Sequence, residues 1–461
     1  MPKGQVVKLS SSSYVPEPDR VLITTAPRDI YEGSHDHKKL PVFTNDGFLD
    51  GFAEYTTDIP DIWKFHTRQR DYGFAFLEAN VPGPTFLHYP FNETIIDHLE
   101  SGQYDVLCIS AFTWTLPWAL GLARMAKSEY GIKEVWLGGY AVMTDEPLIK
   151  KVFDRLFWGY CESLLRQSIG ISPTSNEEIK HPNLITEASW LGRNTKTGHL
   201  IFRRGCPNSC TYCADPVFQP GGDYPLSINA INQILDFYKW EGIRSVYVSN
   251  QETHMLNAFG KEVLYAIKSR GLNFGMLTSF KALAFRGEDG MKELRDSGLS
   301  FLLIGLESLS DKNLEKAKRK ASQELMEKTL NLLRKLNISV TSTYMICFED
   351  DTEESIRQSK KRIIDLGITV SLFNITVPLP GTPLYYSYKE KGFINDWNWS
   401  HWTGNHLVWK HPSIAPEVAR ELLAEMRGEV NHPHYNPTLK SEWDRNLKNI
   451  RRHSEHDSLR I

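Results

Sequence analysis

The first third of the chain alternates short apolar runs with segments of helical spacing. Apolar runs of this length, bounded by turn residues, are typical of buried strands; they occupy residues 19–27, 104–111, 134–141 and 155–161. Between them apolar residues recur at intervals of three and four, which indicates helices, at residues 92–102, 116–131 and 145–152. Strands that alternate with helices form parallel βαβ units, so we expect an open, doubly wound α/β sheet.

A second alternation begins after a polar, proline-containing stretch that reads as a linker. Its predicted strands are residues 200–204, 245–250, 273–278, 301–308, 339–346 and 370–377. Its predicted helices are residues 229–240, 261–270, 291–297, 324–336 and 353–366. Six βα-type units in series predict a partial or full parallel barrel, with its chemistry at the carboxyl ends of the strands.

The remainder of the chain holds several tryptophans and a predicted helix near residues 416–427. This composition suits a small C-terminal helical cap, whose tryptophans either line a substrate pocket or pack in the core. Residues 30–81 show no regular pattern, so no secondary structure is predicted for them. We therefore expect four parts, at residues 1–171, 172–195, 196–378 and 379–461.

Composition narrows the function classes. The 461 residues carry a net charge of −3, which gives no reason to expect nucleic acid as the partner. The start of the chain is polar, and no run approaches the ~18 apolar residues of a membrane span, so we expect a cytoplasmic protein with no transmembrane segment. In that compartment the 6 cysteines are thiols or metal ligands rather than disulfides. The basic pair Arg451 and Arg452 reads as part of a solvated end.

Three cysteines, Cys206, Cys210 and Cys213, form a CxxxCxxC motif directly after a predicted strand. A structural zinc site normally needs four ligands, yet the next histidine is His254 and the next cysteine is Cys347. Three thiolates on one tight loop suit a [4Fe–4S] cluster with one iron open to another ligand. Zinc, or merely buried cysteines, remain the alternatives.

The segment RGCPNSCTYC, residues 204–213, resembles the radical S-adenosylmethionine (SAM) signature. The resemblance implies a partial (βα)6 barrel and a cluster whose open iron binds SAM. It also implies a 5′-deoxyadenosyl radical that takes a hydrogen atom from the substrate. Tyr212 stands where the family places an aromatic residue beside the adenine.

Two strand ends fit further SAM contacts in such a barrel. Glu307 ends one predicted strand, where a buried carboxylate needs a donor or a cation as its partner. A salt bridge to a nearby lysine is the alternative reading. Ser249 and Gln251 end another strand, although the glycine-rich form usual in the family is absent there.

The N-terminal segments also resemble successive landmarks of the cobalamin-binding, Rossmann-like domain that precedes many radical SAM barrels. These segments are residues 73–79, 104–110, 135–139 and 159–162. Open α/β sheets bind ligands across the carboxyl ends of their strands. There Ser110, Thr113 and Thr115 offer hydroxyls, and Gly138 and Gly139 allow close backbone approach.

A histidine ligand to cobalt is not expected. The Asp-x-His-x-x-Gly motif of other cobalamin proteins is missing, and His35, His37, His88 and His98 lack its context. The resemblance implies base-off cobalamin without histidine ligation.

The leading hypothesis is a cobalamin-dependent radical SAM C-methyltransferase that acts on an unactivated carbon. Such a transfer has no acid/base route, so no catalytic side chain is assigned and the cofactors carry the chemistry. The alternatives are ring formation or oxidation with the same cofactors, a sheet that binds substrate or a partner protein instead of cobalamin, and an iron–sulfur carrier or sensor. The substrate class stays open between a small molecule, a lipid, a tetrapyrrole and a peptide or protein, and flavodoxin or ferredoxin is the expected electron donor.

Overall fold

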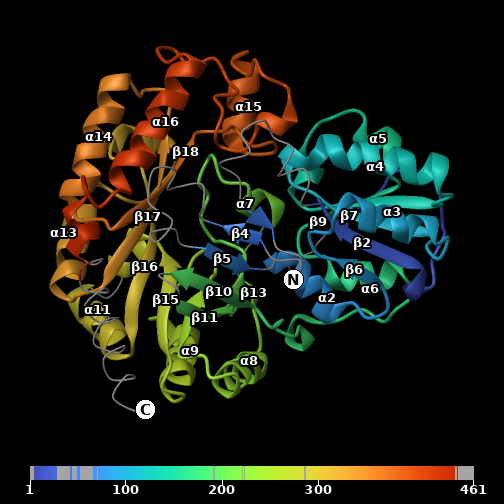
Figure 1. Cartoon of the computed structure of the whole chain (residues 1–461), viewed down its shortest axis with the longest axis horizontal. Coiled ribbons are helices and arrows are strands. Elements are labelled where there is room, and N and C mark those ends of the chain that lie inside the picture. The colour runs from blue at the N-terminus through green and yellow to red at the C-terminus, as the bar shows by residue number, and fades with distance from the viewer. Residues whose placement is uncertain are drawn as a thin grey trace.

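The computed structural model describes residues 5–27, 42–43, 49–51, 66–69, 71–190, 193–220, 222, 224–284, 287–441 and 444. Two mainly parallel sheets lie side by side, the N-terminal one in blue and cyan and the parallel strands of the second in green to orange (Figure 1). His35, His37, Arg451, Arg452 and most of the unassigned segment 30–81 lie outside the described residues.

The N-terminal sheet confirms the predicted doubly wound architecture. Its strand order is β1-β9-β8-β7-β2-β6, and all neighbours are parallel except the edge pair β1–β9. The strands are β1 (Gln5–Lys8), β2 (Val21–Thr25), β6 (Thr85–Leu87), β7 (Val106–Ser110), β8 (Glu134–Gly138) and β9 (Arg155–Trp158). The helices are α2 (Tyr72–Asn80), α3 (Asn92–Glu100), α4 (Leu116–Glu129), α5 (Ile149–Val152) and α6 (Glu162–Ser168).

The second sheet contains six parallel strands, five of which lie where the sequence predicts them. They run in the order β18-β17-β16-β15-β14-β11. Their bounds are β11 (Arg193–Leu200), β14 (Ser245–Val248), β15 (Asn273–Thr278), β16 (Leu299–Glu307), β17 (Ser339–Ile346) and β18 (Val370–Ile375). The crossover helices are α8 (Ile228–Trp240), α9 (Ala258–Lys268), α11 (Gly287–Asp296), α13 (Gln323–Lys335) and α14 (Glu353–Asp365).

The start of this sheet differs from the prediction. The segment expected as a linker, residues 172–195, contains β10 (Ile185–Trp190), which pairs antiparallel with β11. The first parallel strand is therefore β11 and not residues 200–204, of which only β12 (Arg203–Arg204) is extended. Polar residues interrupt the apolar ones in β10 and fill much of β11, so neither gives the apolar run by which a buried parallel strand is recognised. Beyond β10 the sheet continues through β5 (His66–Gln69), β4 (Leu49–Gly51) and β3 (Val42–Phe43).

The C-terminal segment contacts both parts of the molecule. Helix α16 (Pro416–Val430) confirms the predicted helix and lies against β18 and α14. Trp399, Trp402 and Trp409 are buried, so these tryptophans pack in the core. Tyr385 in α15 (Pro383–Glu390) donates a hydrogen bond to Asp145 of the N-terminal part at 2.6 Å. No helix in the described residues is long and apolar enough to cross a membrane.

Candidate functional site

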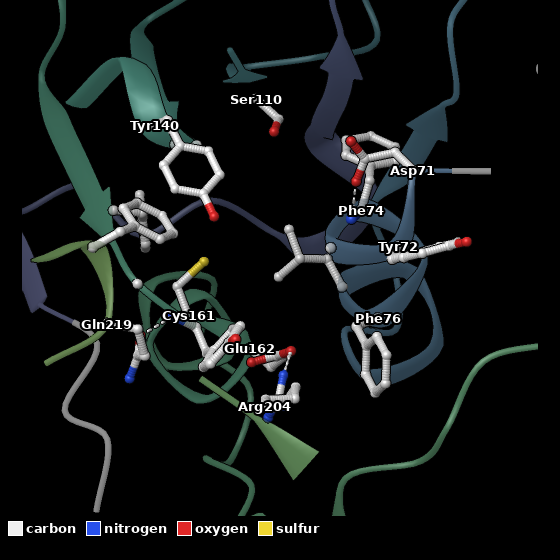
Figure 2. Close-up of a pocket in the computed structure, with 18 of the residues that line it drawn as sticks. Asp71, Tyr72, Phe74, Phe76, Ser110, Tyr140, Cys161, Glu162, Arg204 and Gln219 are labelled. Carbon is white, nitrogen blue, oxygen red and sulfur yellow. Dashed lines mark hydrogen bonds and ion pairs between the residues drawn. The ribbon is translucent and has the colours of Figure 1, made fainter. Parts of the chain in front are cut away.

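A cavity of about 520 Å³ lies between the carboxyl ends of the two parallel sheets. Its walls come from β7, β8 and β9 on the N-terminal side, from β12 and the segment after β14 on the other, and from α2. In Figure 2, Tyr140 and Cys161 face Asp71 and Phe74 across the cavity. Both sheets therefore present to one space the strand ends at which such folds bind ligands.

The wall supplied by the N-terminal sheet is mostly apolar. Among its lining residues are Ile23, Cys108, Trp136 and Phe157, all of which are buried. Cys108 lies in the apolar interior, and burial holds the pKa of its thiol well above the usual range. A wall of this kind contacts a ligand through shape and not through charge.

The hydroxyls and glycines predicted at this edge have different positions. Ser110 and Gly138 line the cavity, and a methyl group added at Gly138 would come no closer than 3.9 Å to any described atom. Gly139 also lines the cavity, but its φ of +78° and its closeness to Ala111 show that it serves the turn. Thr113 and Thr115 are buried in the 3₁₀ turn before α4 and are not part of the lining.

A buried ion pair joins the two halves of the site. Arg204, two residues before the first motif cysteine, pairs with Glu162 at the start of α6. The guanidinium also lies 4.4 Å from the Tyr160 ring centroid and 5.1 Å from that of Phe76. Figure 2 shows the pair at the edge of the cavity. Because both charges are buried, each depends on the other to offset its lost hydration.

Further bonds fix the segment after the cysteines on the N-terminal part. Tyr140, which follows Gly139, donates a hydrogen bond to Asp215, two residues after Cys213. The amide of Gln219 accepts from the Tyr160 N–H at 2.7 Å. Gln251, expected to contact SAM, accepts from the Gly205 N–H at 3.2 Å and donates to the Tyr160 hydroxyl at 2.8 Å. Gln251 thus lies at the start of the cysteine loop and already has partners there.

The three motif cysteines lie on one short loop. The Cys213 N–H donates to the Cys210 carbonyl at 3.2 Å. Burial holds the pKa of the Cys213 thiol well above its usual range, and the nearby Asp215, Cys210 and Cys206 add smaller rises. In the part of the chain that the structure describes, no three His, Cys, Asp or Glu side chains are arranged around a single metal ion. A cubane cluster does not need three ligands around one metal ion, since each thiolate binds a separate iron.

Glu307 lies beside this loop and has a side-chain hydrogen bond with Tyr212 of the loop. Glu307 ends β16, and its Oε1 accepts from the Thr343 hydroxyl at 3.0 Å and lies 3.8 Å from Nη2 of Arg319. Burial raises the pKa of Glu307, and the Arg319 guanidinium counteracts part of that rise. Nη1 of Arg319 lies 3.8 Å from Sγ of Cys210. The cation that partners Glu307 is thus an arginine that also contacts the cysteine loop, not a lysine.

Glu252 is a carboxylate that the sequence reasoning missed. It is 4% exposed, and its Oε2 accepts from Asn208, which lies between two of the motif cysteines, at 2.7 Å. Its Oε1 is buried with no partner among the described residues. A buried carboxylate oxygen without a donor is costly unless a ligand supplies one. The sequence did contain a signal for Glu252. It is the charged residue of the polar segment that follows β14, in which only Ser249 and Gln251 were predicted to contact SAM.

The geometry agrees with the comparisons to known proteins. Residues 200–363 match the family model of the radical SAM superfamily. The chain contains a radical SAM domain. The resemblance drawn from the cysteine motif is thereby confirmed, and the motif, Glu252 and Glu307 all lie inside the matched range.

Two relatives from Chlorobaculum tepidum are methyltransferases. The bacteriochlorophyllide d C-8(2)-methyltransferase is 28% identical over 247 residues, which cover 51% of this chain and 54% of that relative. The chain therefore spans about half the length of that protein. The bacteriochlorophyllide d C-12(1)-methyltransferase is 22% identical over 77% of this chain and 80% of its own length.

A solved structure shares the fold outside the radical SAM domain as well. It is the radical SAM methyltransferase TsrM from Kitasatospora setae, with cobalamin and a [4Fe–4S] cluster bound. The TM-score is 0.57 at 13% identity, over 87% of this chain and 84% of TsrM. At this identity the likeness shows the fold alone: a Rossmann-like sheet placed before a radical SAM barrel.

A buried polar network joins the radical SAM domain to α2. His199 on β11 contacts the hydroxyls of Tyr72 at 2.6 Å, Ser249 at 2.8 Å and Thr186 at 2.5 Å. Burial lowers the pKa of His199 to about 3, so the ring is neutral at ordinary pH. Tyr72 and Ser249 line the cavity. Ser249, predicted as a SAM contact, therefore faces this network.

Two other histidines of the N-terminal part, His88 and His98, have local partners. His88 pairs with Glu78 at 2.9 Å, and His98 contacts the Tyr104 hydroxyl at 3.0 Å. No histidine belongs to the lining of the cavity as far as the structure describes it.

Proposed function

We propose that this protein is a cobalamin-dependent radical SAM C-methyltransferase that acts on an unactivated carbon. The observation that carries the proposal is the cavity between the two sheets, bounded on one side by an apolar wall with open glycine backbone and on the other by the edge that bears the cysteine loop. The methyltransferase relatives and the fold shared with TsrM support the same assignment.

On the barrel side, Cys206, Cys210 and Cys213 would hold a [4Fe–4S] cluster. The donor set suits it, because three thiols converge on one loop and an arginine lies beside one of them. The unpaired Oε1 of Glu252 would accept a hydrogen bond from the ammonium of SAM, and Tyr212 and Glu307 would lie along the rest of that ligand.

On the N-terminal side, the apolar wall and Gly138 would receive cobalamin. The space that a methyl group at Gly138 would enter is open, so a flat ring can approach the backbone there. When bound, the two cofactors supply the radical and the methyl group, while the protein holds both beside the substrate and excludes water.

The site's own residues serve this arrangement by fixing the distance between the two walls. Arg204 with Glu162, and Tyr140 with Asp215, connect the cysteine loop directly to the wall that would hold the corrin ring. A shift of about 1 Å between reacting groups can lower a rate about 100-fold. We therefore assign these four residues to positioning and not to proton transfer.

The test is anaerobic reconstitution of the full chain with iron, sulfide and hydroxocobalamin. We expect about four irons per chain and retention of cobalamin, read from its visible absorbance after desalting. With SAM and reductant, formation of both 5′-deoxyadenosine and S-adenosylhomocysteine would indicate methyl transfer. 5′-Deoxyadenosine alone would favour cyclisation or oxidation, and failure to retain cobalamin would refute its assignment to the N-terminal sheet.

A further inference from the structure

An arginine from outside the cysteine loop contacts the most buried of the three motif cysteines. Cys210 is 7% exposed, whereas Cys206 and Cys213 are each partly exposed. Nη1 of Arg319 lies 3.8 Å from Sγ of Cys210, and only 13% of the arginine side chain is accessible. A buried charge is screened less than a surface charge, so the positive charge of Arg319 acts strongly on this sulfur.

The backbone holds Arg319 in a fixed place beside the loop. Lys318, the residue before it, has a φ of +54°, which is uncommon for a residue with a side chain. Nη2 of Arg319 donates to the Gly305 carbonyl at the end of β16 at 2.8 Å. From the cysteine loop, the Thr211 N–H donates to the Ala317 carbonyl at 3.1 Å. The loop and the segment that carries Arg319 are therefore joined by hydrogen bonds, and the guanidinium is anchored at the sulfur.

The ion pair with Glu307 does not account for this placement. The carboxylate Oε1 is 3.8 Å from Nη2 of Arg319, farther than the Gly305 carbonyl that the same nitrogen contacts at 2.8 Å. An arginine that served Glu307 alone would not need its other terminal nitrogen at the sulfur of Cys210. The guanidinium is shared between a carboxylate, a carbonyl and a motif cysteine, so part of its charge acts on the cysteine loop.

We propose that Arg319 raises the reduction potential of the cluster that Cys206, Cys210 and Cys213 would hold. The inference rests on the proposed function, because it needs that cluster. In the step concerned, the cluster takes one electron from an external one-electron reductant, and no bond forms or breaks. A positive charge and an N–H donor beside a cluster sulfur stabilise the reduced, more negative form. Arg319 acts through the sulfur and takes no part in the bond changes of the reaction.

The test is a potentiometric titration of the reconstituted full chain, without SAM, followed by EPR of the reduced cluster. R319Q removes the charge and keeps an amide donor, whereas R319K keeps the charge. The matched control K320Q removes a charge from the next residue, an exposed lysine. The iron content of each variant is measured first, so that potentials are compared only between fully loaded clusters.

We expect the reduction equilibrium of R319Q to be about tenfold less favourable, which lowers the potential by about 59 mV for one electron. R319K and K320Q should stay close to the unmodified chain. An unchanged potential in fully loaded R319Q, an equal shift in K320Q, or a shift in R319K as large as that in R319Q would each overturn the inference. Weaker SAM binding by R319Q at an unchanged potential would also overturn it, because Arg319 would then contact SAM.

A second measurement does not depend on the stability of any variant. In an unmodified chain grown with isotope-labelled arginine, pulsed EPR of the reduced cluster should detect coupling to a guanidinium nitrogen. A cluster without such coupling would overturn the contact between Arg319 and the cluster. An unmodified chain that takes up no four-iron cluster would instead refute the proposed function itself.

Discussion

The two sheets bring different chemistry to the cavity they share. The N-terminal sheet contributes buried apolar side chains and open glycine backbone to its lining, whereas the barrel contributes the buried Arg204 and places its cysteine loop and the unpaired oxygen of Glu252 beside the cavity. The first surface selects a ligand by shape, because it has little charge to offer. The second selects charged groups, because its own charges are buried and need partners. The difference indicates two cofactors held by two kinds of interaction.

The largest expected effect comes from removing a proposed cluster ligand, a change confined to the barrel side of the cavity. Cys206→Ala should abolish the cluster and all 5′-deoxyadenosine formation, because the remaining two thiolates leave two irons without protein ligands. Iron and sulfide content after anaerobic reconstitution measures the result. Cys347→Ala, at a buried cysteine outside the loop, should keep the full iron content. A cluster that persists in Cys206→Ala would contradict the assignment of the motif.

The next effect tests the connection between the two walls. Arg204→Met should lower the free energy of unfolding by about 3–5 kcal/mol, because it leaves Glu162 buried without its cation. The double variant R204M/E162L should recover much of that loss, since it removes both charges. Thermal melting of the chain without cofactors measures both. Additive destabilisation in the double variant would show that the two side chains act independently.

Much of this arrangement could be predicted because its signals are local. Apolar runs and three-to-four-residue periodicity located β15 and β17 at their observed bounds and the crossover helices to within a few residues. The cysteine loop was recognised from the spacing of its three cysteines alone. Buried parallel strands and amphipathic helices are recognised by composition over a single segment, without knowledge of their neighbours.

The parts that were missed depend on partners distant in the chain. Strand β10 is stabilised by pairing with β11 and β5, and its mixed sequence ITEASW contains no continuous apolar run. Tyr72 and His199 are 127 residues apart and meet only in the folded chain. Glu252 follows β14 in an irregular segment, where no periodicity tells which side chain turns toward the cysteine loop. Contacts of this kind are set by tertiary packing.

A smaller effect tests the charge-selective wall. Glu252→Gln keeps the size of the side chain and an acceptor for Asn208, but removes the charge. A hydrogen bond to a charged group contributes about 1.5–3 kcal/mol, so we expect SAM affinity to fall roughly 10- to 100-fold. Equilibrium binding of SAM to the reconstituted chain measures it. Glu353→Gln on the exposed face of α14 serves as the control, and equal affinities in the two variants would remove Glu252 from the SAM site.

The smallest expected effect comes from substitutions at two adjacent glycines of the apolar N-terminal wall, which test whether that wall selects its ligand by shape. Gly139→Ala should lower stability by about 1–3 kcal/mol, because its φ is +78° and a methyl group would lie 2.5 Å from the Ala111 carbonyl oxygen. Gly138→Ala strains nothing, since its nearest described neighbour would be 3.9 Å away. It should leave the melting temperature nearly unchanged and weaken cobalamin retention, because the methyl group enters the space where the ring would lie. If Gly138→Ala retains cobalamin as well as the unmodified chain does, this stretch of backbone does not contact the ring, and the apolar wall has another occupant.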